Sequence, residues 1–386
     1  MKQQLSKLAL YALLGVCMAA CRKSEHEPII SSQVIQVTSP VTVADGGICG
    51  FFLLNEANMG SNKASLDYFD YRTGKYHRNI YPERNPNVIK ELGDVGNDLR
   101  IYRDRLYAVL NCSNLVEVMD ARTVRSVGSV TIKNCRYIAF DGDYAYVSSF
   151  ASELNSAPDA PGKVVKVDLN TLKTVGECVV GYQPEEMVIT GGKLYVANSG
   201  VYRAPGYDKT VSVIDLAGFS EIKKIELGPK LHRMTADNYG NIYISSRPDG
   251  PDKPSKTYIL DTSDDSVTVL DELPNSGMAL AGDMLYIYSI DRDDKTGEKP
   301  ITYIKWDTAS KQVASQSFIT DGSEGSISIP YGVAVNADNG EIFVTDSPNF
   351  TTPGYLYCYS AEGKLRWSVR TGDIPAHIAF TRKQME

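Results

Sequence analysis

The sequence predicts an all-β fold, a seven-bladed β-propeller, and three observations lead to this prediction. A strand pattern recurs about every 48 residues, a second strand pattern closes on an aspartate at a turn, and no long segment has the 3.6-residue apolar period of a helix. Alternating apolar and polar residues between glycine- and asparagine-rich turns are typical of short strands. Repeats of this size, arranged radially, bury the faces of their sheets against neighbouring repeats.

The first repeated pattern is an apolar strand that contains an aromatic residue and runs into small polar residues. Its copies begin at Leu106, Tyr146, Leu194, Ile242, Leu285 and Ile342, with a weaker copy at Phe51. The second pattern follows each copy of the first and ends at Asp70, Asp120, Asp168, Asp215, Asp261 and Asp307, with Ser360 in the seventh place. Because an aspartate carboxylate accepts hydrogen bonds from the backbone two residues further on, we interpret these residues as turn formers.

The C-terminal segment indicates how the ring closes. Residues 373–380 match the segments that open other repeats, such as residues 181–188, but no complete repeat follows them. We therefore expect this segment to pair with the strand at Phe51 as the innermost strand of the first blade. The result is a seven-bladed β-propeller over residues 47–382, closed by its C-terminal strand.

The N-terminus has the order of features that defines a signal peptide. Lys2 and Lys7 form a short basic region, and the apolar run that follows is shorter than the roughly 20 residues needed to span a bilayer. Small residues then lead into Cys21, an arrangement that resembles a bacterial lipobox. The resemblance implies a signal peptide over residues 1–20, acylation of Cys21, and a lipid-anchored tether over residues 21–46.

The N-terminal segment also determines the expected net charge of the mature chain and its expected location in the cell. Removal of the two signal-peptide lysines changes the formal net charge from −7 to −9, and the chain contains no basic cluster, so nucleic acid is not an expected partner. An acidic stretch at residues 24–27 is similar to the surface-export signals of some Gram-negative lipoproteins. We expect a protein anchored in the outer membrane and exposed at the cell surface.

Five cysteines remain after the predicted cleavage site, an odd number that leaves at least one thiol free or paired between chains. Their spacing does not match a zinc motif. We interpret them as small buried residues of strands, and a Cys112–Cys135 disulfide is the alternative.

The candidate binding residues lie where the blades begin and in the loops on the same face. These loops are long, and long loops on one face of a rigid scaffold commonly carry binding sites. The blade-opening residues differ from repeat to repeat, whereas a purely structural position would converge on one residue type. This divergence predicts an asymmetric ligand-binding mouth. Its candidate residues are Asn97, Asp98, Asn111, Arg136, Tyr137, Gln183, Asn198, His232, Arg233, Arg247, Tyr331 and His377.

Sequence patterns of catalysis are not found. The chain has no serine nucleophile elbow, no HExxH motif and no glycine-rich phosphate loop. We therefore expect a binding protein without catalytic residues, cofactor or metal. The alternative is a cation held by Glu56, Asp98, Glu185 and Asp346, as in propeller lactonases.

The repeats resemble those of YncE-like propellers, in which Gly-x-x-Pro, Leu-Tyr-Val-Ala-Asn and Val-x-Val-Ile-Asp recur, and residues 181–227 match this pattern best. Together with the lipobox, residues 55–67 and 95–98 resemble the BtuG-type surface lipoproteins of gut Bacteroides-type bacteria. This resemblance implies that the mouth binds cobalamin or a related corrinoid, and that a TonB-dependent outer-membrane transporter receives it. A surface scaffold or glycan-binding propeller is the alternative.

Overall fold

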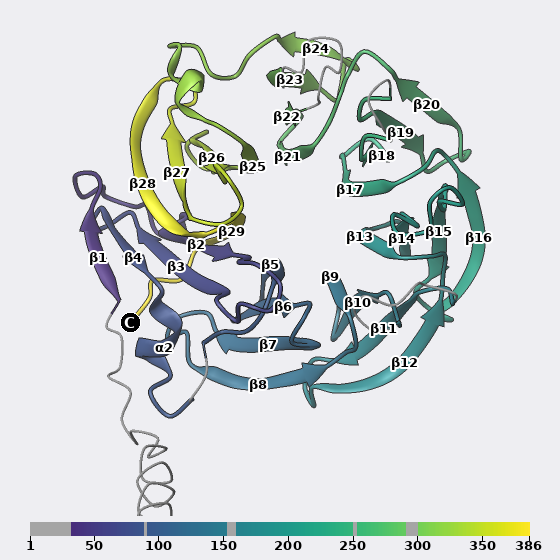
Figure 1. The fold of residues 1–386 in the computed structure, drawn as a ribbon, viewed down its shortest axis with the longest axis horizontal. Coiled ribbons are helices and arrows are strands. Elements are labelled where there is room, and N and C mark those ends of the chain that lie inside the picture. Colours follow the sequence, from purple (N-terminus) through teal and green to yellow (C-terminus); the bar gives the residue numbers. More distant parts are fainter. Residues whose placement is uncertain (1–31, 89–90, 153–159, 250–252, 291–299) are drawn as a thin grey trace, which may run out of the picture. The chain divides into compact units, whose positions relative to one another are not determined.

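In the computed structural model, seven antiparallel sheets are arranged in a ring (Figure 1). The structure describes residues 32–88, 91–152, 160–249, 253–290 and 300–386, so the predicted signal peptide and lipid attachment at Cys21 lie outside the described residues. A short helix, α2 (Ile80–Arg84), and a 3-10 turn, η1 (Ser323–Ser326), lie in connecting segments. Within the described ranges, no helix is both long enough and apolar enough to cross a bilayer.

The sheets form blades 1 to 7, and in each blade the first-named strand is the innermost and the last-named strand is the outermost. Blade 1 contains β29 (Pro375–Thr381), β2 (Gly50–Asn55), β3 (Ser65–Asp70), β4 (Lys75–Arg78) and β1 (Gln33–Gln36). Blade 2 contains β5 (Gly96–Tyr102), β6 (Arg105–Leu110), β7 (Leu115–Asp120) and β8 (Ser126–Thr131), and blade 3 contains β9 (Cys135–Asp141), β10 (Tyr144–Ser149), β11 (Lys163–Asp168) and β12 (Lys173–Val179). Blade 4 contains β13 (Pro184–Thr190), β14 (Lys193–Asn198), β15 (Thr210–Asp215) and β16 (Ser220–Glu226), and blade 5 contains β17 (Leu231–Ala236), β18 (Asn241–Ser246), β19 (Thr257–Asp261) and β20 (Val267–Leu270). Blade 6 contains β21 (Gly277–Ala281), β22 (Met284–Ile290), β23 (Ile301–Asp307) and β24 (Gln312–Ser315), and blade 7 contains β25 (Pro330–Val335), β26 (Ile342–Asp346), β27 (Pro353–Tyr359) and β28 (Leu365–Asp373). The predicted fold class is confirmed.

Apolar side chains between neighbouring blades hold the ring together. Among the described residues, each pair of adjacent blades shares one cluster of buried apolar side chains. Between blades 7 and 1, the ring of Phe51 lies 4.8 Å from that of Phe343 and 5.9 Å from that of Phe380. Since one four-stranded sheet cannot bury both of its faces alone, each blade depends on its neighbours for stability.

The predicted closure of the ring is confirmed. Strand β29 pairs antiparallel with β2, from Gly50 opposite Thr381 to Asn55 opposite Pro375. Blade 1 is therefore built from both ends of the propeller sequence. The hydrogen bonds between β2 and β29 join a strand near the start of this sequence to its last strand.

Strand β1 changes the predicted boundary between tether and propeller. Residues 33–36 lie within the predicted tether of residues 21–46, but they form a fifth, outermost strand of blade 1 instead. Gln33 lies opposite Arg78 of β4, and the Arg78 guanidinium donates a hydrogen bond to the Gln33 side chain at 2.8 Å. The physical reason is that an edge strand offers unpaired backbone groups to a nearby extended segment.

The aspartates at the ends of the third strands act as turn formers, as predicted. The carboxylate of Asp120 accepts the backbone N–H of Arg122 at 2.9 Å, and that of Asp168 accepts the N–H of Asn170 at the same distance. Equivalent bonds occur at Asp70, Asp261 and Asp307. These bonds explain why the residue type recurs at this position.

The five cysteines of the propeller are free thiols, so the Cys112–Cys135 disulfide that the sequence left as an alternative does not form. Four of them are buried, as expected for small strand residues. Burial raises the pKa of the Cys135 thiol to about 12 and that of the Cys112 thiol to about 11. Both are therefore protonated at neutral pH and are poor nucleophiles.

Gly332 allows a close backbone approach between blades 7 and 1 and offers a test of ring closure. A Cβ atom at this position would lie 2.2 Å from the carbonyl oxygen of Ala376 in β29. We expect Gly332→Ala to lower the free energy of unfolding by roughly 1–3 kcal/mol, because the two inner strands must separate. Chemical denaturation followed by circular dichroism measures this change. The matched control is Gly325→Ala, where no atom lies within 4 Å of the added Cβ; equal losses in both variants would contradict the prediction.

Candidate ligand-binding site

A cavity of about 310 Å³ lies at the centre of the ring, between the innermost strands of the blades. Its apolar lining includes Met234, Met278 and Val333. Its charged and phenolic lining comes from six blades and consists of Asp98, Arg100, Glu186, Arg233, Tyr288, Tyr331 and His377. We call the opening of this cavity at the N-terminal ends of the inner strands the mouth.

One ion-pair group at the mouth joins blades 3, 4 and 5. Glu185, which is only 1 % exposed, accepts hydrogen bonds from Arg136 at 3.0 Å and from Arg247 at 3.4 Å. The Arg136 guanidinium also lies 4.8 Å from the centroid of the Phe150 ring. Two guanidinium groups therefore share one buried carboxylate, which leaves this side of the mouth with a surplus of positive charge.

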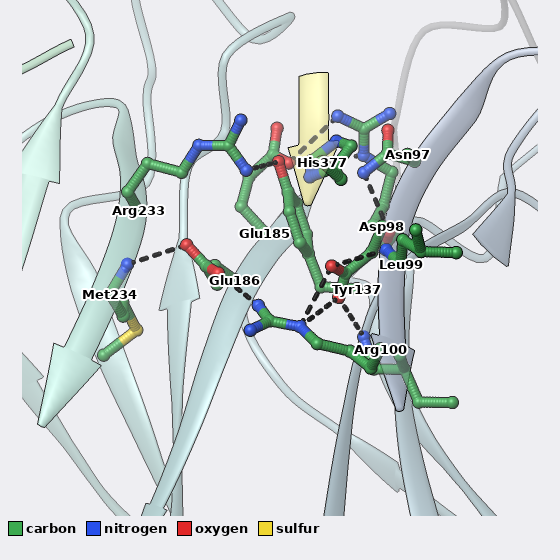
Figure 2. Close-up of polar contacts among 12 residues, drawn as sticks. Asn97, Asp98, Leu99, Arg100, Tyr137, Glu185, Glu186, Arg233, Met234 and His377 are labelled. Carbon is green, nitrogen blue, oxygen red and sulfur yellow. Dashed lines mark hydrogen bonds and ion pairs between the residues drawn. The ribbon is translucent and has the colours of Figure 1, made fainter. Parts of the chain in front are cut away.

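A second ion-pair group has the opposite balance. Arg100 donates to Asp98 at 3.0 Å and to Glu186 at 2.7 Å, so one guanidinium serves two carboxylates (Figure 2). The backbone N–H of Met234 donates to Glu186, and that of Ile138 donates to Asp98. Strands of blades 2, 3, 4 and 5 are thus held together by two buried or half-buried acids.

A cluster of two neutral side chains and one cation lies beside these ion pairs and consists of Tyr137, His232 and Arg233. Arg233 donates to the phenolic oxygen of Tyr137 at 3.0 Å (Figure 2). Nε2 of His232 lies 3.3 Å from the same oxygen. Burial, together with the positive charges of Arg247, Arg233 and Arg136, lowers the pKa of His232 well below its ordinary value. His232 is therefore neutral at neutral pH and available for hydrogen bonding.

Blades 1 and 7 contribute a third polar group. Glu56, which follows β2, lies 3.0 Å from Nε2 of His377 and accepts the Tyr331 hydroxyl at 2.8 Å. Burial and the adjacent Glu56 carboxylate raise the pKa of Tyr331 well above its usual range. The hydroxyl of Tyr288 donates to the Tyr331 carbonyl at 2.5 Å, and burial raises the pKa of Tyr288 to about 12. These phenols remain protonated across the physiological range.

The structure distributes the predicted site residues over three environments. Asp98, Arg233, Tyr331 and His377 line the cavity. Arg136, Tyr137, His232 and Arg247 form the polar layer that contacts these residues or the shared acid. The remaining four are buried and hydrogen-bonded to neighbouring strand or loop residues: Asn97, Asn111, Gln183 and Asn198.

The four buried amides position backbone in the structure. For example, Asn198 accepts the N–H of Gly181 and donates to Ser212, while Asn111 donates to the side chain of Asn134. Which of the twelve candidates contacts a ligand stays a prediction.

Three charged or phenolic residues of the cavity lining are absent from the candidates drawn from the sequence: Arg100, Glu186 and Tyr288. The alternation of side chains along a strand indicates Arg100 as a cavity residue, because it is two residues beyond Asp98 and shares its face of β5. Glu186 directly follows Glu185, and adjacent residues of a strand point to opposite faces of the sheet. The sequence does not show which of the two acids lines the cavity, because that depends on where their partner arginines lie. Tyr288 belongs to a second strand, β22, and no sequence pattern separates it from the core aromatics of other blades.

The four acids considered as a cation site do not converge. Asp98 pairs with Arg100, Glu185 with two arginines and Glu56 with His377, while Asp346 accepts the N–H of Ile329 at 2.7 Å. In the part of the chain that the structure describes, no group of three or more His, Cys, Asp or Glu side chains is suited to hold a metal ion.

Aromatic residues stand on the rim of the mouth at two places. Phe350 packs edge-on against Tyr331 at 5.6 Å, and Tyr202 packs against Phe150 at 6.4 Å. Tyr202 is 73 % exposed and Phe350 is 39 % exposed. Solvent-exposed aromatic faces above buried charged groups are suited to contact the apolar face of a polar ligand.

Residues 49–371 match the model of a family described as a domain of unknown function, DUF5074. The chain belongs to this family. The match covers all seven blades apart from β1, β29 and the end of β28, so membership in the family extends over most of the propeller and its mouth. No curated protein is significantly similar in sequence.

Solved structures with the same fold come from distant proteins. A hypothetical selenium-binding protein from Sulfolobus tokodaii superposes with a TM-score of 0.62 at 10 % identity, over 90 % of this chain and 98 % of that one. A quinonprotein alcohol dehydrogenase-like protein from Bacteroides thetaiotaomicron superposes with a TM-score of 0.59 at 18 % identity, over 86 % and 78 %. Apo AztD from Citrobacter koseri superposes with a TM-score of 0.53 at 12 % identity, over 87 % and 99 %. These similarities show the fold alone.

Proposed function

We propose that this chain is a surface lipoprotein that binds cobalamin or a related corrinoid at the propeller mouth and passes it to a TonB-dependent outer-membrane transporter. The observation that carries the proposal is the mouth itself, where dissimilar polar side chains from six blades surround one cavity. Support for the ligand comes from the resemblance of residues 55–67 and 95–98 to BtuG-type lipoproteins. In this proposal Cys21 is acylated and anchors the protein in the outer membrane.

The size of the cavity determines how such a ligand is bound. Drug-sized ligands occupy pockets of about 300–1,000 Å³, and a corrinoid is larger than most of them. A cavity of about 310 Å³ therefore accepts one peripheral group, while the corrin ring lies across the mouth against the rim. In this proposal the exposed faces of Tyr202 and Phe350 contact this ring.

The chemistry of the mouth suits a ligand rimmed with amides. Guanidinium, imidazole and phenol groups supply dispersed hydrogen-bond donors and acceptors, and most of the charges are already paired within the protein. Because these side chains are held by ion pairs, several of which join different blades, they lose little conformational entropy on binding. Such preorganisation allows tight binding without a large rearrangement.

The exposed rim aromatics also favour a second candidate, a glycan-binding propeller. Sugars stack their apolar faces on flat aromatic side chains, and Tyr202 is the most exposed large hydrophobic residue among those described. A glycan would bind at the rim without a group in the central cavity.

Calorimetric titration of the mature protein with cyanocobalamin tests the proposed function. We expect one ligand to bind per propeller, and Tyr202→Ala to weaken binding by about 1 kcal/mol, roughly fivefold, because a ring contact is lost. The matched control is Tyr239→Ala, since Tyr239 is 54 % exposed in the β17–β18 turn at the opposite face. The absence of heat at micromolar protein would overturn the corrinoid assignment, and heat with oligosaccharides alone would support the glycan alternative.

A further inference from the structure

Arg233 differs from the other arginines of the mouth in its partners. Arg100, Arg136 and Arg247 each form an ion pair with a carboxylate at 3.4 Å or less. In contrast, no carboxylate among the described residues forms an ion pair with the Arg233 guanidinium. Its one hydrogen bond to a described residue uses the neutral Tyr137 hydroxyl, so most of its five N–H donors have no acceptor in the described part of the protein.

The position of Arg233 points these donors at the cavity. The residue is part of the cavity lining, and its guanidinium reaches Tyr137 with one nitrogen while the other terminal nitrogen has no marked contact (Figure 2). The centroid of the Tyr137 ring lies 5.4 Å from the guanidinium, so this contact and the hydrogen bond to the Tyr137 hydroxyl both restrain the side chain. The guanidinium group of Arg233 is therefore held in position before a ligand binds.

The surroundings favour an anion at this place. Arg136 and Arg247 share the single carboxylate of Glu185, so their group adds positive charge on the same side of the mouth. His232 stands next to Arg233 and is uncharged at neutral pH, which leaves it able to accept or donate a hydrogen bond. Glu186 and Glu56 attract Arg233, but neither forms an ion pair with it. A ligand that brings a negative charge within hydrogen-bonding distance therefore stabilises this partly desolvated cation.

We propose that Arg233 is an oxyanion-binding residue, and that it takes a carboxylate or phosphate group of the ligand bound at the mouth. A planar guanidinium matches two oxygens of such a group with two parallel hydrogen bonds. For corrinoids this proposal rests on the function proposed above, and it identifies the group that enters the cavity. Cobalamin carries one phosphodiester anion in its nucleotide loop, and this anion is the group that Arg233 binds.

Two ligands and four proteins test the proposal by calorimetry at fixed ionic strength. The ligands are cyanocobalamin and dicyanocobinamide, which lacks the phosphodiester. The proteins are the wild type, Arg233→Gln, Arg233→Lys and Arg103→Gln, the last being a matched control because Arg103 is an exposed residue of the β5–β6 turn at the opposite face. Thermal unfolding confirms that each variant is folded. If the glutamine variant is unstable, Arg233→Lys takes its place in the comparison, because it retains the charge.

We expect Arg233→Gln to weaken cyanocobalamin binding by about 10- to 100-fold, the usual effect of losing charge-assisted hydrogen bonds. Binding of dicyanocobinamide by this variant should match that of the wild type, and Arg103→Gln should leave both affinities unchanged. Arg233→Lys should lie between the wild type and Arg233→Gln for cyanocobalamin, because a lysine cannot bind two oxygens in parallel. Equal losses for both ligands, or no loss for either, would overturn the proposal.

A separate measurement distinguishes failure of this proposal from failure of the corrinoid function. If neither corrinoid binds the wild type, the function proposed above fails, and melting temperatures in sodium phosphate, sodium acetate and sodium chloride at equal ionic strength decide the role of Arg233. Phosphate or acetate should raise the melting temperature of the wild type and not that of Arg233→Gln. No difference between the three salts for the wild type would show that the cavity binds no oxyanion.

Discussion

Deletion of residues 374–386 is expected to abolish cooperative folding, the largest effect predicted for this protein. The deletion removes β29, the innermost strand of blade 1, and leaves the inner edge of β2 without its pairing partner. It also removes Phe380 from the aromatic cluster with Phe51 and Phe343 between blades 7 and 1. Because every blade buries its faces against its neighbours, an open ring exposes apolar surface at both broken ends.

Far-UV circular dichroism during urea unfolding measures this effect. The wild type should unfold in one sigmoidal transition, whereas the shortened chain should lack this transition and be rapidly digested by a protease. Deletion of residues 384–386 alone is the control, since it leaves β29 intact. A sigmoidal transition at the wild-type midpoint after removal of residues 374–386 would show that closure by β29 is dispensable.

Replacement of Glu185 by glutamine is expected to lower the free energy of unfolding by about 3 kcal/mol. The substitution preserves the volume of the side chain but removes the only carboxylate that neutralises both Arg136 and Arg247 in the described structure. Arg136 is 15 % exposed, so its charge would be left largely out of water without a counter-charge. Breaking a buried ion pair in this way costs about 3–5 kcal/mol, and the partial exposure of Arg247 places the value at the lower end.

A matched substitution separates this effect from a general loss of charge. Glu177 forms a pair with Lys163 at 2.7 Å, but its side chain is 51 % exposed. Glu177→Gln should change stability by less than about 1 kcal/mol, because solvent screens exposed pairs. Both variants are compared with the wild type by chemical denaturation. Similar stabilities for the two variants would mean that Glu185 does not carry the structural charge balance of the mouth.

The charge arrangement at the mouth connects stability with binding. Ion pairs cross from blade to blade, as between Arg136 of blade 3 and Glu185 of blade 4, and they hold the mouth side chains in fixed positions. Arg233 is the exception among the mouth arginines, since its donors face the cavity and lack a carboxylate partner among the described residues. The paired charges thus fix most of the mouth side chains, and Arg233 is the charge that we propose binds an anion.

Much of the fold was predictable from the sequence because its information is local and repeated. The aspartate at the end of each third strand, such as Asp120 or Asp168, forms its turn through bonds two residues away. Ring closure was also predictable, because residues 373–380 repeat a blade-opening segment without a blade to follow. In contrast, β1 was missed, because its four residues fall outside the repeat and pair with β4, which is distant in the sequence.

The sequence by itself determined the seven blades, the way they close and the segments that meet at the mouth. Only the tertiary structure decided what each side chain at the mouth does, because its partners come from other blades. Asn198 and Asp98 both belong to the predicted mouth, yet Asn198 bonds within its own blade while Asp98 lines the cavity beside Arg100. The pairing of Glu185 with Arg136 and Arg247, and the freedom of Arg233 from such a pair among the described residues, depend on distances across the ring that no local pattern encodes.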